Sequence, residues 1–204
     1  MKTCFVHWPS LQEELSPFLG ELQGKVLNAG SGRRSIFIPK ATEMINMDLE
    51  SFENVDVVGD LESIPFDDKT FDGVLNVAVL EHVKRPWIVI QELSRVLKRG
   101  GKLLCVVPFF QPIHYVPTDY FRFTPDGIRS LLEDAGFKIL ASKETHSMWH
   151  TIGWMLEDKM KDKPAFFRLL AAPFAVFFYL LSKYHNLGSK TFPNAITLIA
   201  QKDI

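Results

Sequence analysis

The sequence has little cysteine and no excess of either charge. Only two of its 204 residues are cysteines, Cys4 and Cys105. Two cysteines make no disulfide framework, and no cluster of cysteine and histidine has the spacing of a zinc site. There are 23 lysine and arginine residues against 24 aspartate and glutamate residues, a formal net charge of −1. Nucleic-acid-binding domains usually carry a basic excess, so this balance predicts no nucleic-acid partner. Because no zinc-type spacing is present, we also expect no bound metal.

The sequence also lacks internal repeats, low-complexity segments and a long apolar stretch near its start. Without the apolar core of a signal peptide in MKTCFVHWPSLQEEL, we expect a cytoplasmic protein. Hydrophobic residues make up 47% and charged residues 23%, which is typical of a globular domain. The length suits one domain over residues 1–204.

Strand and helix patterns alternate along most of the chain. Ser10 and Glu13 form a capping box, which predicts a helix over 10–22, broken near Pro17, inside an N-terminal helical segment of residues 1–24. This alternation predicts an α/β fold, with a mostly parallel sheet and helices on both faces. The predicted strands are 25–28, 43–48, 55–58, 71–77, 102–107, 137–142 and 195–201, and the further helices are 86–98 and 124–135.

The stretch VLNAGSGRR, residues 26–34, predicts a tight turn after a buried strand. Gly30 and Gly32 leave backbone groups open to a ligand, and open α/β sheets bind ligands at the carboxyl ends of their strands. Asp48, at the end of the next strand, has the spacing of an acid that binds ribose hydroxyls, although a plain turn beside a surface aspartate fits too. A dinucleotide site is disfavoured, because Ser35 stands where a third glycine is needed and the segment that follows is too short for a crossover helix.

Further motifs decide which ligand this turn holds. In chain order the motifs are Val26–Gly32, Asp48, Asp60–Val74, Leu80–Val83 and Leu97–Gly101. Together they resemble the class I S-adenosylmethionine-dependent methyltransferases, specifically the type 11 methyltransferase-domain group, over about residues 24–142 and the final strand. The resemblance implies a Rossmann-like fold, a seven-stranded and mostly parallel sheet with an antiparallel last strand, and S-adenosyl-L-methionine as the cofactor.

The resemblance also implies which residues bind this cofactor. Gly30 and Gly32 would underlie its methionine part, and Asp48 would accept both ribose hydroxyls. Two departures from the family pattern keep a non-catalytic, cofactor-binding or scaffold protein open as the alternative: Asn28 replaces the usual acid, and Arg34 replaces the third glycine. The remaining implied positions are Ala29 and Ser31 for backbone contacts, Leu49, Asp60 and Leu61 near the adenine, and Asn76 and Val77 on the methionine side.

Residues 108–127 follow a strand and are rich in polar and aromatic groups, which predicts a substrate loop. The loop resembles a branch of the type 11 group that is associated with carbohydrate or lipid-linked pathways, so we expect a small-molecule acceptor of that kind. A sulfonium methyl group needs alignment, and it needs a base only where the acceptor loses a proton. His114 is the first candidate for this base, because imidazole titrates near neutral pH.

Two other residues are candidates for the reacting end of the site. Asp119 either orients His114 or pairs with Arg122 to hold the loop. His82 either faces the substrate or serves as a helix cap or a core histidine. The remaining histidines, His7, His146, His150 and His185, show no partner pattern and receive no role.

Residues 143–194 are predicted to form an apolar helical insertion before the last strand. Leu169–Leu181 carries no charge, but its 13 residues are fewer than the roughly 20 needed to span a bilayer, so we expect no transmembrane helix. Because residues 165–185 are apolar on all sides, three roles stay open: a cover over the sheet or active site, a homodimer interface, or a peripheral membrane contact. Trp149 and Trp154 are expected to belong to the same apolar cap.

Overall fold

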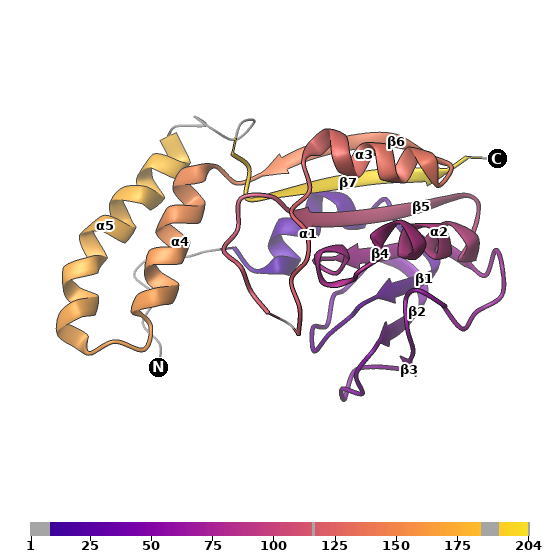
Figure 1. Ribbon diagram of the computed structural model, residues 1–204, viewed down its shortest axis with the longest axis horizontal. Helices are drawn as coiled ribbons and strands as arrows, with labels where there is room; N and C mark the ends of the chain where they lie inside the picture. Colours follow the sequence, from indigo (N-terminus) through magenta and orange to yellow (C-terminus); the bar gives the residue numbers. More distant parts are fainter. Residues whose placement is uncertain (1–8, 116, 185–191, 204) are drawn as a thin grey trace.

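A computed structural model describes residues 9–115, 117–184 and 192–203, and these form a seven-stranded sheet with helices on both faces (Figure 1). Cys4, His7 and His185 lie outside the described residues. The strands are β1 (Gln23–Ala29), β2 (Lys40–Asp48), β3 (Val57–Val58), β4 (Phe71–Val77), β5 (Leu97–Pro108), β6 (Phe137–Thr145) and β7 (Ala195–Lys202). The helices are α1 (Leu11–Leu19), the 3₁₀ turn η1 (Leu80–His82), α2 (Pro86–Val96), α3 (Pro125–Asp134), α4 (Met148–Met160) and α5 (Ala165–Tyr184).

The strand order is β3-β2-β1-β4-β5-β7-β6. The pairs from β3 through β5 are parallel, whereas β7 runs antiparallel to both β5 and β6. This confirms the predicted mostly parallel sheet with an antiparallel last strand. The boundary between α2 and β5 was predicted wrongly, because β5 already begins at Leu97 and runs through the Gly100–Gly101 pair.

Helix α1 begins with the predicted capping box, in which the Ser10 backbone N–H donates to the Glu13 carboxylate at 2.7 Å. The predicted break at Pro17 is wrong, and α1 is continuous. Pro17 has no N–H for the carbonyl of Glu13, but the Ser16 hydroxyl donates to that carbonyl at 2.8 Å. This bond replaces the one that proline removes.

Two apolar cores cover the two faces of the sheet. On one face, Leu15 and Leu19 of α1 pack with side chains of β1, β4 and β5 such as Leu75. On the other face, α2 and α3 pack against the sheet through residues such as Leu93 and Leu132. Cys105 lies buried in this second core, as expected. The central strands β1, β4, β5 and β7 are thus largely buried, so a ligand can reach them at their ends.

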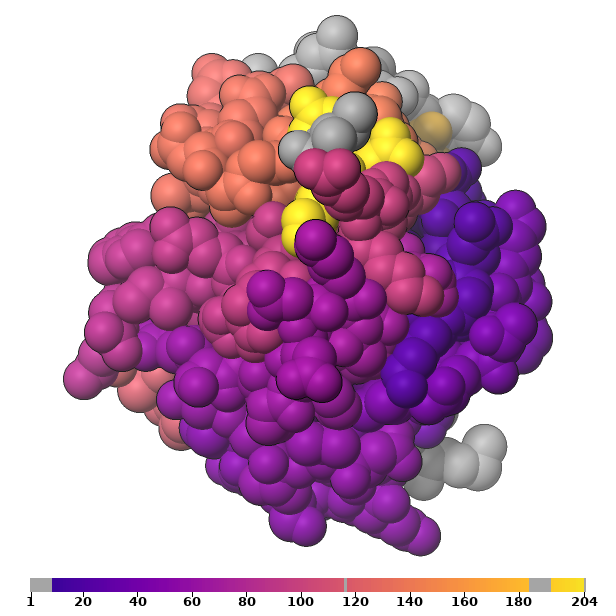
Figure 2. Space-filling model, turned by 90° about the vertical axis from the view of Figure 1, so that its right-hand side faces the viewer, coloured from indigo at the N-terminus to yellow at the C-terminus, as the bar shows by residue number. Residues whose placement is uncertain are grey.

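The insertion is an antiparallel pair of helices, α4 and α5, that stands beside the sheet (Figure 1). It leaves β6 and returns to β7 at the end where the parallel strands finish. Seen from the opposite end, the surface comes mainly from the first hundred residues, with the last strand in yellow at the top (Figure 2). Trp149 stacks on Phe178 with ring centroids 6.0 Å apart, so Trp149 does belong to the apolar cap.

Helix α5 differs from the prediction in length and in burial. It continues through Pro173 and past the uncharged stretch to 20 residues, so the length argument against a membrane helix was wrong. In the described part of the chain, Ala165–Lys183 is a helix long and apolar enough to cross a membrane by length and composition alone. Only 6% of that segment is buried, so α5 does not cover the sheet. Its exposed apolar side chains include Phe166, Phe167, Leu169, Leu170, Phe174, Phe177 and Leu180.

Candidate active site

A pocket of about 370 Å³ opens at the carboxyl ends of the parallel strands. The strand order reverses between β1 and β4, which is where open α/β sheets bind ligands. Among the described residues, none of α4 or α5 lines it, so the insertion does not cover the site. The predicted site residues on its walls are Gly30, Gly32, Asp48, Leu49, Asp60, Leu61, His82 and His114. Arg34, which the sequence analysis noted only as a departure from the family pattern, lines the pocket as well. The other lining residues were not predicted: Glu50, Phe52, Gly59, Ala78, Val79, Val83 and Pro117.

The predicted glycine turn forms the floor of the pocket. Gly30 and Gly32 have φ of +77° and +57°, which glycine adopts without strain. The N–H groups of Gly30 and Ser31 donate to the carbonyl of Met47 at 2.8 and 3.0 Å, which fixes the turn to β2. A Cβ at Gly30 would lie 2.4 Å from Cγ2 of Val79, whereas a Cβ at Gly32 would meet nothing within 4 Å. The turn is therefore closely packed at Gly30 and open at Gly32.

Asp48 is held at the pocket edge by two backbone N–H groups. Gly32 donates to its Oδ2 at 2.7 Å and Glu50 donates to its Oδ1 at 3.1 Å. Each carboxylate oxygen can accept more than one hydrogen bond, so both can still accept from a ligand. On the neighbouring loop, Asp60 accepts from the Glu62 N–H at 2.8 Å. The two carboxylates are thus positioned before any ligand binds.

Five of the predicted cofactor residues lie beneath the pocket walls. The Asn28 amide donates to the Asn46 side chain at 2.9 Å, and the Asn76 amide donates to the Ala29 carbonyl at 3.0 Å. These bonds connect β1 to β2 and to β4. The Val77 side chain belongs to the core on the α1 face of the sheet. The five predicted residues that do not line the pocket are Asn28, Ala29, Ser31, Asn76 and Val77.

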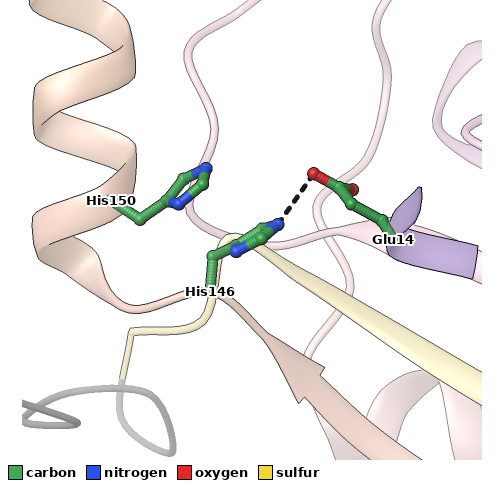
Figure 3. A group of neighbouring side chains, drawn as sticks. All are labelled: Glu14, His146 and His150. Atoms are coloured by element: carbon green, nitrogen blue, oxygen red, sulfur yellow. Dashed lines mark hydrogen bonds and ion pairs between the residues drawn. The ribbon is translucent and has the colours of Figure 1, made fainter. Parts of the chain in front are cut away.

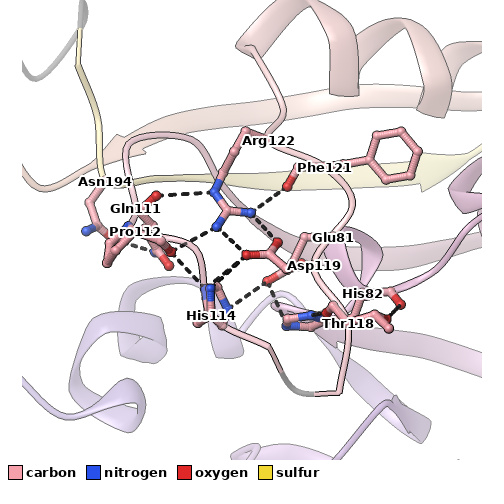
Figure 4. A network of polar contacts seen from close by, with 10 residues as sticks. All are labelled: Glu81, His82, Gln111, Pro112, His114, Thr118, Asp119, Phe121, Arg122 and Asn194. Carbon is pink, nitrogen blue, oxygen red and sulfur yellow. Dashed lines mark hydrogen bonds and ion pairs between the residues drawn. The ribbon is translucent and has the colours of Figure 1, made fainter.

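At the end of the pocket that His82 and His114 line, residues from two segments meet (Figure 4). His82 comes from η1 and His114 from the loop between β5 and α3, and their rings lie edge to face with centroids 5.0 Å apart. The Nδ1 of His82 contacts the carbonyl of Thr118, and the Thr118 hydroxyl donates to the His82 carbonyl at 3.0 Å. Burial lowers the pKa of His82, and the contact with Thr118 opposes that shift.

Asp119 holds the loop rather than facing the pocket. Its carboxylate pairs with both terminal nitrogens of Arg122, at 2.5 and 2.7 Å, and accepts from the His114 backbone N–H at 2.8 Å. Arg122 keeps the pKa of Asp119 well below its usual range. Only 2% of the Asp119 side chain is exposed, while its Oδ2 lies 3.8 Å from Nδ1 of His114. Both predicted roles for Asp119, pairing with Arg122 and orienting His114, fit this geometry.

Glu81 is a functional candidate that the sequence analysis missed. Its side chain is 1% exposed, and its Oε1 lies 3.6 Å from Nε2 of His82 and 4.0 Å from Nε2 of His114. Burial raises the pKa of Glu81 to about 7. The residue stood inside the Leu80–Val83 motif, but nothing in the sequence indicated that a glutamate there would be buried.

A second cluster gives His146 and His150 neighbours that no sequence pattern indicated (Figure 3). His146 Nε2 lies 2.8 Å from the Glu14 carboxylate, and the two imidazoles stack with centroids 3.7 Å apart. Glu14 belongs to α1, so this contact ties the start of the insertion to the N-terminal helix. The four-residue spacing of the histidines was visible in the sequence, but the distant glutamate was not.

Comparison with known proteins gives a consistent result. Residues 23–105 match the model of a methyltransferase domain, the type 11 group. A demethylmenaquinone methyltransferase from Shouchella clausii is 30% identical over 119 residues, which cover 53% of this chain and 46% of the relative. The ubiquinone/menaquinone biosynthesis C-methyltransferase UbiE of Cronobacter sakazakii is 28% identical over 159 residues, 71% of this chain and 63% of the relative. The chain thus spans less than two thirds of the length of these relatives.

Solved structures share the fold at lower identity. The [4+2]-cyclase SpnF superposes with a TM-score of 0.60 at 18% identity, over 93% of this chain and 81% of that one. An S-adenosylmethionine-dependent methyltransferase from Methanosarcina mazei gives 0.55 at 17% identity, over 88% and 92%. The ordered motifs, the sheet topology and the domain matched over residues 23–105 make this chain similar to the class I S-adenosylmethionine-dependent methyltransferases of the type 11 group, whose fold it shares.

Proposed function

We propose that this protein transfers the methyl group of S-adenosyl-L-methionine to a small-molecule acceptor. The observation that carries the proposal is the Asp48 carboxylate, held on the pocket wall by the N–H of Gly32 and facing the space where a ribose would lie. The matched domain and the quinone methyltransferase relatives support the same reaction class. A cofactor-binding protein without catalysis is the alternative.

The cofactor would lie across the pocket from Asp60 to the glycine turn. The adenine would lie beside Leu49, Asp60 and Leu61, and the ribose hydroxyls would donate to Asp48. The methionine tail would lie over Gly30 and Gly32, where no side chain blocks the backbone. Asn28 would leave the cofactor's ammonium group without the usual carboxylate partner. The methyl group would then face the end of the pocket formed by His82 and His114.

The chemistry needs alignment of the acceptor with the sulfur–methyl bond and exclusion of water. Such alignment supplies on the order of 7–11 kcal/mol at best. Where the acceptor carries a proton to be lost, His114 takes it, because its ring lies on the pocket wall. Asp119 and Arg122 position His114 through its backbone N–H.

Titration calorimetry with S-adenosylhomocysteine tests the cofactor assignment. Asp48→Ala should weaken binding by at least about tenfold, because hydrogen bonds to a charged group contribute roughly 1.5–3 kcal/mol. Asp56→Ala is the matched control: its carboxylate also accepts a backbone N–H, that of Asn46 at 2.7 Å, but it lies outside the pocket walls. Unchanged affinity in Asp48→Ala, or binding of NAD in place of S-adenosylhomocysteine, would refute the assignment.

His114→Ala tests the catalytic assignment with the same ligand. Turnover should fall while the affinity for S-adenosylhomocysteine stays near that of the wild type, since His114 meets the acceptor and not the nucleoside. A loss of affinity with unchanged turnover would show that the base is elsewhere. Tight cofactor binding with no turnover on quinol, carbohydrate or lipid-linked acceptors would favour the non-catalytic alternative.

We further propose a lipid-linked acceptor, reached while α5 lies on a membrane surface. The exposed apolar side chains of α5 support this, as do Arg168 and Lys183, cations near its two ends. The hairpin leaves the sheet at the same end as the pocket, which would bring the pocket mouth near the lipid. The relatives are named for demethylmenaquinone and for ubiquinone/menaquinone biosynthesis, so a quinone-type acceptor is tested beside other lipid-linked ones.

Flotation with anionic phospholipid vesicles tests the membrane contact. The double variant Phe174→Glu/Phe177→Glu should lose most of its vesicle binding, because both rings are exposed on α5, at 62% and 54%. Phe37→Glu is the control, since its 73% exposed ring lies far from α5 in sequence and outside the hairpin. A wild-type dimer in light scattering that does not float with vesicles would instead identify α5 as a homodimer interface.

A further inference from the structure

Three potential metal ligands converge at the reacting end of the pocket. Glu81 and His82 are adjacent in η1, and His114 reaches them from the loop after β5 (Figure 4). One ligand atom from each lies within 4.8 Å of the other two. Two imidazoles and one carboxylate are the ligand set of many catalytic zinc and non-haem iron sites, which keep a further position open.

The two imidazoles are oriented for coordination through Nε2. Nδ1 of His82 faces the Thr118 carbonyl, and Nδ1 of His114 lies 3.2 Å from the Pro112 carbonyl. A carbonyl only accepts, so each Nδ1 carries the proton and each Nε2 keeps its lone pair. Metal-binding histidines usually have such a partner on the other ring nitrogen, here with the Asp119 carboxylate beside His114 as well. The Nε2 atoms of His82 and His114 lie 3.6 and 4.0 Å from the same oxygen of Glu81, Oε1, so all three atoms surround one point.

The buried carboxylate of Glu81 has one oxygen without a hydrogen-bond partner among the described residues. This oxygen is Oε2, and only 1% of the side chain is exposed. Burial of a carboxylate oxygen that has no partner is costly. A cation bound between Oε1 and the two Nε2 atoms would compensate the buried charge.

The cluster of Glu14, His146 and His150 is less suited to a metal (Figure 3). Its imidazoles are nearly parallel, at 15°, so their lone pairs do not converge on one point. His146 already has a hydrogen-bonding partner in Glu14 at 2.8 Å. This cluster therefore serves as a control for the first one.

We propose that Glu81, His82 and His114 bind one divalent transition-metal ion, such as Zn²⁺, whose open position faces the cofactor pocket. His82 and His114 line that pocket, so the ion would bind an oxygen of the acceptor beside the methyl group. With the ion bound, His114 is a ligand and the ion replaces it in activating the acceptor.

The reaction in this form rests on the proposed methyl transfer. An acceptor hydroxyl bound to the ion has a lowered pKa and loses its proton to solvent. A lone pair of that oxygen forms the bond to the methyl carbon. The electron pair of the sulfur–methyl bond passes to sulfur, and S-adenosylhomocysteine leaves as a neutral thioether.

Metal titration of the full chain, stripped with EDTA, tests the inference without turnover. Zn²⁺ should bind with a stoichiometry of one in calorimetry, and Mg²⁺ more weakly, because Mg²⁺ prefers oxygen ligands. Glu81→Gln and His114→Ala should each weaken Zn²⁺ binding by more than about 100-fold, since even outer partners of a ligand typically contribute 10–100-fold. His146→Ala should bind Zn²⁺ like the wild type.

Visible absorption of bound Co²⁺ gives a second readout, which should be lost in Glu81→Gln even where its thermal unfolding matches the wild type. No Zn²⁺ binding by the wild type, or loss of binding in His146→Ala with retention in Glu81→Gln, would overturn the inference. S-adenosylhomocysteine titration of the same stripped protein tests the proposed function separately. The Zn²⁺ titration therefore tests the metal site, and the S-adenosylhomocysteine titration tests cofactor binding independently of it.

Discussion

Alanine at Gly30 and at Gly32 separates backbone strain from packing in the pocket turn. Both positions have positive φ, so alanine at either costs roughly 1–2 kcal/mol. Only at Gly30 does the new methyl group meet other atoms, Cγ2 and Cγ1 of Val79 at 2.4 and 2.9 Å. Overpacking of this kind costs about 1–3 kcal/mol more. Gly30→Ala should therefore lose about 2–5 kcal/mol of unfolding free energy and Gly32→Ala about 1–2 kcal/mol.

Urea and thermal unfolding measure this difference. For a domain of this size each kcal/mol shifts Tm by about 2–4 °C, so a loss of about 3 kcal/mol in Gly30→Ala lowers Tm by about 6–12 °C. Val79→Ala removes the two methyl groups that the new Cβ would meet. The double variant Gly30→Ala/Val79→Ala should therefore lose less unfolding free energy than the two single variants lose together. Equal losses for Gly30→Ala and Gly32→Ala, or strict additivity with Val79→Ala, would refute the packing argument.

Two further predictions concern stability away from the pocket. The pKa of His150 is lowered to about 3, mainly by burial and to a smaller extent by the charges of His146 and Lys183. An unfolded histidine titrates near about 6.5, so between these values the unfolded chain binds the extra proton. Stability should thus fall as pH drops from about 6.5 towards 3, by at most about 1.4 kcal/mol per pH unit, and urea titrations of His150→Gln should show less of this fall. Arg95 donates to the carbonyls of Ile64 and Phe66, both at 2.8 Å, so Arg95→Met should cost about 1–3 kcal/mol in urea unfolding. The surface variant Arg85→Met should change little, and equal effects of the two would contradict this account.

The sequence predicted the elements well where the signal was local. Capping residues such as Ser10 and Thr124 and the alternation of apolar runs fixed the order of strands and helices. The end of α2 was missed because leucine is a good helix former, whereas pairing with Phe71 of β4 places Leu97 in the strand. The length of α5 was missed because the uncharged stretch was counted instead of the helix.

The site was predicted only where chain motifs carry it. The glycine turn and Asp48 come from neighbouring strand ends, so their meeting follows from a parallel sheet. The approach of Glu81 to His114 depends on how the loop after β5 folds back over η1, through bonds such as Tyr120 N–H to the Glu81 carbonyl at 2.7 Å. No local pattern encodes such a contact. The burial of Glu81 likewise appears only in three dimensions.

The direction of β7 has a consequence for the architecture of the chain. Since β6 ends and β7 begins at one edge, Thr145 pairs with Ala195 although 49 residues separate them. The segment between these two paired residues leaves the sheet and rejoins it at the same place. Lengthening such a segment costs little loop-closure entropy. The hairpin is in this sense a replaceable module, and a short turn in its place would leave the order of the seven strands intact.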